Sequence, residues 1–277
     1  MTHSHDHQAT GLATFAALLT ALVLVIVYAW AVQRLQRRGD TWSVGRFLCF
    51  AGGVLGLTAA FALPLPGRAF TAHMTQHLLI GMLAPLLIVL ARPLTLALRV
   101  LRPGRARQSL LALAHSRWSS FVQLLPVVAV LEVGGLWALY RTPLFAASQE
   151  RPWLHAVVHG HVIVSGLLFA FVICQLDPVR RRYGLVPRAA TVVLAGAAHA
   201  VLAKSLYASP PPGTTFAAAD LAVGAKVMYY GGDVVEILLA VVLALQWYSA
   251  EGRRFTRGLR PGTSSGRALG RLGRASR

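Results

Sequence analysis

Seven apolar segments of membrane length are the feature that most constrains this chain. They run from Leu12 to Val32, Phe47 to Leu63, Phe70 to Leu90, Phe121 to Tyr140, Trp153 to Leu176, Ala189 to Tyr207 and Leu221 to Trp247. A hydrocarbon core about 30 Å thick needs roughly 20 apolar residues per spanning helix. Charged residues make up only 13% of the 277 residues, about half the share of an ordinary globular domain. The sequence therefore predicts an all-α integral membrane protein with seven transmembrane helices.

The basic residues between these segments predict the orientation. Segments rich in Lys and Arg alternate with segments that have few, and the totals on the two sides are 22 and 3. By the positive-inside rule, the N-terminus lies outside and the C-terminus in the cytoplasm. The formal net charge of +18 is confined to short loops without interleaved aromatic residues, which indicates anionic lipid rather than nucleic acid as the partner.

Composition divides the chain into three parts. Residues 1–11 form an external leader that contains His3, His5 and His7, residues 12–248 form the seven-helix domain, and residues 249–277 form a tail rich in Gly, Ser and Arg. Such a tail buries little apolar surface, so we expect it to be disordered and drawn to the anionic cytoplasmic leaflet. The His-rich leader is either a weak collector of metal ions or a polar leader.

Four histidines within the apolar segments form two pairs. His73 and His77 begin the third segment, and His155 and His159 begin the fifth. Residues four apart lie about 40° apart around a helix, so each pair shares one face. Both segments run inward from the outside in the predicted topology, which places all four imidazoles in a common layer about 3 to 11 Å deep. Because buried ionisable groups are costly in a membrane, we predict a shared metal or cofactor site rather than four separate packing histidines.

Further polar side chains are expected at a similar depth. His199, Asp233 and Glu236 are interpreted as ligands, as residues that orient ligands, or as members of an ion pair with Lys204 or Lys226. Met74 is a candidate ligand that can equally fill the core. Roles for three more groups stay open at this point: Glu132, His161 and the leader histidines.

The ligand types favour copper. Imidazole suits copper, zinc, iron and nickel, and copper binds most tightly of the divalent ions. Cys49 and Cys174 fall near the cytoplasmic ends of their segments, away from the histidine layer, and lack metal-ligand spacing. The chain has no His-Glu-x-x-His, phosphate-binding loop or Gly-x-Ser-x-Gly motif, so we expect neither an enzyme nor an ATP-driven pump.

Motifs in three segments resemble a known family. His73-Met74-Thr75-Gln76-His77-Leu78-Leu79, followed by Ala84-Pro85-Leu86-Leu87 and Ala91-Arg92-Pro93, resembles the signature of the CtaG family of cytochrome c oxidase assembly factors. Later matches are Trp153-Leu154-His155, His159 and Gly166, then Asp220, Gly224, Tyr229 and Gly232. The similarity covers most of residues 12 to 248. Tyr229 and Tyr230 stand where the family pattern has a Trp, and Leu221 where it has a Gln.

The resemblance implies a multi-pass protein of the bacterial inner membrane that helps copper reach a haem–copper oxidase. The partners would be an oxidase subunit, a periplasmic copper chaperone as donor, and a second copy in a homo-oligomer. The predicted metal ligands are His73, His77, His155, His159, His199, Met74 and Asp233, with the oxidation state of copper left open. Two alternatives are a haem protein with one axial histidine from each pair, and a proton-coupled metal transporter that uses Asp233 and Glu236.

Overall fold

The computed structural model describes residues 3–114, 116–178 and 180–258, and side chains within residues 14–252 of those ranges. The side chains of the leader histidines and residues 259–277 of the predicted tail lie outside the described part. Within it, every regular element is helical. In chain order the elements are α1 (His3–Gln36), α2 (Val44–Ala62), α3 (Ala69–His77), η1 (Leu78–Leu83), α4 (Ala84–Leu90), α5 (Pro93–Val100), α6 (Arg105–Ala114), α7 (Arg117–Val122), α8 (Leu125–Ala129), η2 (Val130–Gly134), α9 (Gly135–Arg141), α10 (Leu144–Glu150), α11 (Pro152–Cys174), α12 (Leu185–Ala208) and α13 (Ala218–Gly258).

Six helices are long and apolar enough to cross a membrane. These spans are Thr14–Gln36, Val44–Ala62, Ala69–Val100, Pro152–Cys174, Leu185–Ala208 and Ala218–Gly252. They coincide with six of the seven predicted segments, because length and hydropathy are read directly from the sequence. The multi-pass helical architecture is thus confirmed.

The predicted fourth span, Phe121 to Tyr140, has a different form. It consists of the short elements α7, α8, η2 and α9, interrupted at Gln123 and Leu124. Leu125–Arg141 and Leu144–Glu150 are together long and apolar enough to cross a membrane but are bent by 77°, with Pro143 at the bend. The structure therefore has six spans, or up to seven if this bent pair crosses the membrane as one.

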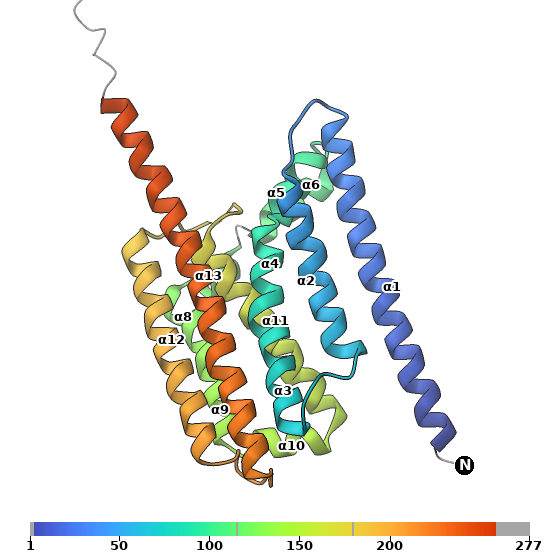
Figure 1. The fold of residues 1–277 in the computed structure, drawn as a ribbon. Coiled ribbons are helices and arrows are strands. Elements are labelled where there is room, and N and C mark those ends of the chain that lie inside the picture. Colours follow the sequence, from blue (N-terminus) through green and yellow to red (C-terminus); the bar gives the residue numbers. More distant parts are fainter. Residues whose placement is uncertain (1–2, 115, 179, 259–277) are drawn as a thin grey trace, which may run out of the picture.

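The long helices form a bundle with α1 at one edge and α12 and α13 at the other (Figure 1). α1 packs on α2 and α5, α3 packs on α13, and α11 lies against η1 and α4. Two large buried clusters fill the bundle. One joins α4, α8, α11, α12 and α13, and the other joins α3, α9, α10, α12 and α13.

Helical structure extends beyond two predicted boundaries. α13 continues through residues 249–258, which the composition places in the tail, and the basic segment from Arg92 to Arg117 contains α5 and α6. α3 starts at the opposite end of the bundle from the first residues of α2 and α12 (Figure 1). The predicted histidine layer and the predicted basic face consequently lie at opposite ends.

Candidate functional site

Asp220 fixes the start of α3, the helix that carries His73 and His77. Its carboxylate accepts hydrogen bonds from the backbone N–H groups of Phe70 and Thr71, at 2.9 and 3.1 Å, and from the Thr71 hydroxyl at 2.6 Å. The first N–H groups of a helix have no partner within the helix, and a carboxylate there satisfies them and complements the helix dipole. Asp220 itself lies in the first turn of α13, so this contact sets α3 against α13.

His73 lies in an aromatic pocket formed by α9 and α10. Its Nε2 is 2.9 Å from the Tyr140 hydroxyl, and its ring contacts the Phe145 ring edge-on at 4.8 Å between centroids. Tyr140 is fully buried, and a buried hydroxyl needs a hydrogen-bond partner. The contact therefore holds the His73 ring in one orientation.

His77 faces His199 across the bundle. The two ring centroids are 6.3 Å apart with an interplanar angle of 28°, and both side chains are almost completely buried. The Nε2 atom of each ring is buried without a hydrogen-bond partner within the described residues. A buried nitrogen without a hydrogen-bond partner costs about 1 to 3 kcal/mol. Two such nitrogens in adjacent rings are therefore candidates for binding a ligand.

His155 and His159 contact each other along α11. Their ring centroids are 4.1 Å apart, and His159 Nδ1 lies 2.9 Å from the His155 carbonyl oxygen. His159 Nε2 lies 3.3 Å from Gln76 Oε1, while the Gln76 amide donates to the Ala60 carbonyl at 2.9 Å. Gln76 therefore connects the histidines of α11 to α3.

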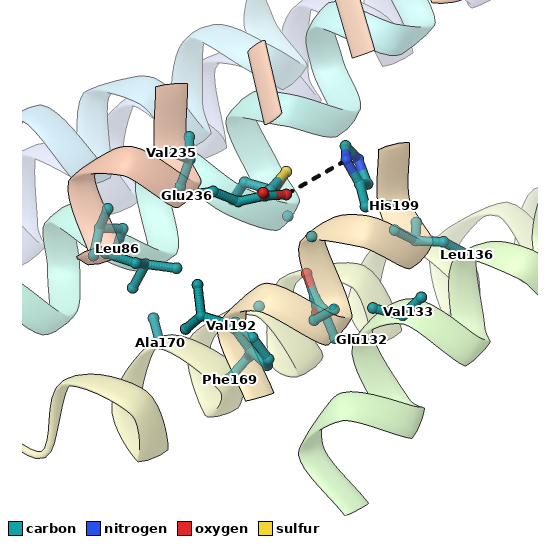
Figure 2. A pocket seen from close by; sticks show the side chains of 16 residues that line it. Leu86, Glu132, Val133, Leu136, Phe169, Ala170, Val192, His199, Val235 and Glu236 are labelled. Atoms are coloured by element: carbon teal, nitrogen blue, oxygen red, sulfur yellow. Dashed lines mark ion pairs between the residues drawn. The ribbon is translucent and has the colours of Figure 1, made fainter. Parts of the chain in front are cut away.

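A small acidic cavity adjoins His199. It measures about 40 Å³ and is lined by Glu132, Glu236 and His199 among apolar side chains of α4, α11 and α13. Figure 2 shows Glu236 and His199 pointing toward each other, with 3.9 Å between Glu236 Oε1 and His199 Nδ1. One water molecule needs about 10 to 15 Å³ on this scale, so the cavity has room for about three.

Two π-helices contribute to the walls of this cavity. η1 contributes Gly81 and Met82, and η2 contributes Glu132 and Val133. Single π turns within α-helices occur often at functional sites. Because η1 starts directly after His77, it leaves the spacing of His73 and His77 unchanged but rotates the residues of α4 around the helix axis.

Two glycines lie where Glu236 and His199 approach a neighbouring helix closely. A Cβ atom at Gly196 would overlap the Glu236 carboxylate, and one at Gly232 would overlap the His199 ring. In helices these glycines cost about 1 kcal/mol each relative to Ala. Their presence at both contacts is explained by the close approach of the two side chains.

The predicted ligands therefore fall into three groups. The first group is His73 with Tyr140, the second is His77 with His199, and the third is His155 with His159. His73 also lies within electrostatic range of His155 and His159. Asp233 is half-buried and within electrostatic range of His199 and Glu236.

Met74 and His161 lie apart from these three groups. Met74 is fully buried in the cluster that contains Phe70 and Met228. His161 is exposed on the bundle surface, with its Nε2 3.0 Å from the Leu131 carbonyl oxygen. In the part of the chain that the structure describes, no three His, Cys, Asp or Glu side chains stand together so as to hold a metal ion.

Sequence reasoning missed the residues that position the histidines. Tyr140 and Gln76 were not candidates, and Asp220 entered only through the family motif. An acidic residue at the start of a helix is a weak signal for Asp220, but its partners are 149 and 150 positions away in the chain. Nothing in the local pattern indicates them.

Comparison with known proteins yields one family and several relatives. The family model described as cytochrome c oxidase caa3 assembly factor matches residues 26–250. Uncharacterized proteins of Mycobacterium bovis and Mycobacterium tuberculosis are each 32% identical over 253 residues, and one of Mycobacterium leprae is 30% identical over 256. These alignments cover 84% of this chain but only 38 to 39% of each relative. The chain thus spans well under half the length of those relatives. No solved structure matches.

Proposed function

Because the chain belongs to the cytochrome c oxidase caa3 assembly factor family, we propose that it supplies copper to a haem–copper oxidase during assembly. In this proposal copper is cargo, received from a periplasmic chaperone on the outer side and passed laterally to an oxidase subunit within the membrane. The histidines of α3, α11 and α12 are the receiving ligands.

The observation that carries this proposal is the pair of facing imidazoles. His77 and His199 each present a buried Nε2 without a hydrogen-bond partner in the described residues, and a metal ion between them would satisfy both. Neutral imidazole nitrogen is a favoured ligand for copper. The nearby Glu236 carboxylate, 3.9 Å from His199 Nδ1, would orient the ring and strengthen its donor nitrogen in the manner of a carboxylate–histidine–metal triad.

Transfer requires that the ligands separate again. His77 and His199 lie on different helices, so a small shift of α3 relative to α12 would change their separation. His73 and His159 are held by Tyr140 and Gln76 rather than by each other, and they would serve as the next ligands along the path. A site divided among three helices in this way suits a metal that is passed on.

Copper binding is tested on the purified full chain. Anaerobic loading followed by metal analysis should give close to one copper per protein for the wild type. His77→Ala and His199→Ala should each lower the copper content at least tenfold, because each removes one of two facing ligands. His161→Ala is the matched control, since that imidazole is exposed and points elsewhere.

The cellular role is tested separately. Cells that lack this gene should accumulate less active oxidase, and a plasmid copy should restore it, whereas His77→Ala should restore little. Normal oxidase maturation without the gene would refute the assembly role. Equal copper in the wild type and in a His73, His77, His155, His159 quadruple Ala variant would refute the ligand assignment.

The acidic cavity favours one second candidate, a proton-coupled metal transporter. Glu132 and Glu236 face the same small cavity beside His199, and buried acids with water are typical of proton pathways in membranes. This function predicts copper flux into proteoliposomes that follows a pH gradient and is lost in Glu236→Gln.

A further inference from the structure

A second, larger cavity lies at the basic end of the bundle, opposite the histidines. It measures about 680 Å³ and is formed where the start of α2, the α4–α5 junction, the end of α11, the start of α12 and residues 242–249 of α13 meet. Figure 1 shows these segments at one end of the bundle. Four guanidinium groups line it: Arg46, Arg92, Arg182 and Arg188.

These four guanidinium groups have no carboxylate in direct contact among the described residues. None of the four guanidinium groups lies within 4.0 Å of a carboxylate in that part of the chain. Asp177 lies within electrostatic range of Arg92 and offsets part of its charge. The Asp177 carboxylate also accepts hydrogen bonds from the backbone N–H and the hydroxyl of Thr95, at 2.8 and 2.5 Å. Four guanidinium groups against this one nearby carboxylate leave an excess of positive charge around the cavity, which favours a bound anion.

Arg188 is the most deeply placed of the four. Only 7% of its surface is exposed, and its guanidinium donates to the Ile173 carbonyl at 2.9 Å, to Gln246 Oε1 at 2.8 Å and to the Gly184 carbonyl at 3.2 Å. All three acceptors are neutral. A buried charge without a counter-charge is costly, and hydrogen bonds to neutral oxygens orient the group without neutralising it.

The backbone points to the same cavity. Arg92 and Gln175 have φ values of 54° and 47°, and they are the non-glycine residues with positive φ in the described chain. Both line this cavity. The left-handed region favours glycine and costs other residues about 1 kcal/mol or more, and Pro93 restricts Arg92 further. Long polar side chains at both positions indicate that the side chains themselves are needed there.

An apolar part of the cavity wall indicates the kind of anion. Leu90, Leu176, Val242 and Leu245 also line the cavity. Guanidinium groups bind phosphate oxygens through paired N–H donors, and basic pockets between transmembrane helices bind phospholipid headgroups. A hydrophilic inorganic anion would gain nothing from the apolar wall, whereas an acyl chain would pack on it.

We propose that this arginine cavity binds the phosphate group of an anionic phospholipid, with the lipid's acyl chain against the apolar wall. Arg92 and Arg182 contact the phosphate and Arg188 supplies charge from the interior. Arg46 is held in place by stacking on Trp42, with 4.6 Å from its guanidinium carbon to the ring centroid. The site is independent of copper and of the proposed function.

The test uses the full chain in nanodiscs that contain equal amounts of phosphatidylglycerol and phosphatidylcholine. Native mass spectrometry after release should show the wild type retaining phosphatidylglycerol in preference to phosphatidylcholine. A basic side chain near the headgroup contributes about 1 kcal/mol to lipid affinity, so Arg92→Gln and Arg182→Gln should each lower retention about fivefold. Arg37→Gln is the matched control, because Arg37 is an exposed arginine at the same end and does not line the cavity.

Three outcomes would overturn the proposal. Equal retention by the wild type and both cavity variants would show that these arginines hold no lipid. Equal retention of the two lipids would show that the cavity does not select lipids by headgroup charge. Complete displacement of the lipid by millimolar inorganic phosphate would show a site for a soluble anion. Arg92→Gly removes the guanidinium and suits the left-handed backbone at this position. This variant should remain folded and still retain less phosphatidylglycerol, which separates loss of lipid binding from loss of the fold.

Discussion

The packing of His199 against Gly232 gives the sharpest prediction about the histidine cluster. A Cβ atom at Gly232 would overlap His199 Cε1 and lie 2.7 Å from Nδ1, whereas ordinary contacts begin near 3.4 Å. Gly232→Ala must therefore push the imidazole ring by about 1 Å in a close-packed interior. The overlap falls on Cε1 and on the adjacent Nδ1, and Nδ1 is the ring atom that faces Glu236.

The magnitude follows from two opposing terms. Replacing Gly by Ala within a helix favours folding by about 1 kcal/mol, while overpacking a buried site costs about 1 to 3 kcal/mol. We expect a net loss of up to about 2 kcal/mol in the free energy of unfolding, together with weaker copper binding. Gly160→Ala is the matched control, because its Cβ would meet nothing within 4 Å and helix propensity alone should stabilise the protein.

The assay is unfolding of both variants in mixed micelles, combined with copper titration. The two substitutions should shift stability in opposite directions, and Gly232→Ala alone should weaken copper binding. If Gly232→Ala matches Gly160→Ala in stability and the wild type in copper affinity, then the position of the His199 ring is not what the structure implies.

Three further perturbations test the framework around the site. Asp220→Ala removes all the bonds from that carboxylate to the start of α3, so the unfolding free energy should fall by about 2 to 4 kcal/mol; an unchanged value would refute the anchoring role. Gly166→Ala should reduce the yield of folded protein sharply, because its Cβ would overlap the Gly81 carbonyl oxygen, and normal expression would contradict that packing. Copper at 100 times its dissociation constant should raise the unfolding free energy of the wild type by about 2.7 kcal/mol. A chelator should reverse this gain, and the same gain in His77→Ala would place the metal elsewhere.

Features that depend on hydropathy and local spacing were predictable from the sequence. Six spans follow directly from apolar length. The pairing of His155 with His159 also follows, because α11 is one uninterrupted α-helix in which residues four apart contact each other. The orientation in the membrane stays a prediction of the positive-inside rule.

Features that depend on tertiary packing were not predictable. The 3.6-residue period fails across η1 and η2, because each π turn adds a residue and rotates the next part of the helix about its axis. The sequence alone therefore does not show that Met82 and Glu132 face the same cavity as His199. The hydrogen bond between His73 and Tyr140 joins residues 67 positions apart, which no periodicity reveals.

α13 links the two ends of the molecule, and this linkage can be measured. Asp220 at its start anchors α3, Glu236 faces His199, and Gln246 holds Arg188 in the arginine cavity. Because α13 is one continuous helix, Asp220 and Gln246 are joined by a rod about 39 Å long, and a tilt that moves one end also moves the other.

Separate sites this far apart normally contribute additively to stability, within about 0.3 to 0.5 kcal/mol. We expect a double-mutant cycle of Asp220→Ala and Gln246→Ala to give a coupling energy above that range, since either change frees the same helix to tilt. Additive effects would show that α13 is held independently at its two ends, and that the histidine cluster and the arginine cavity act without mechanical connection.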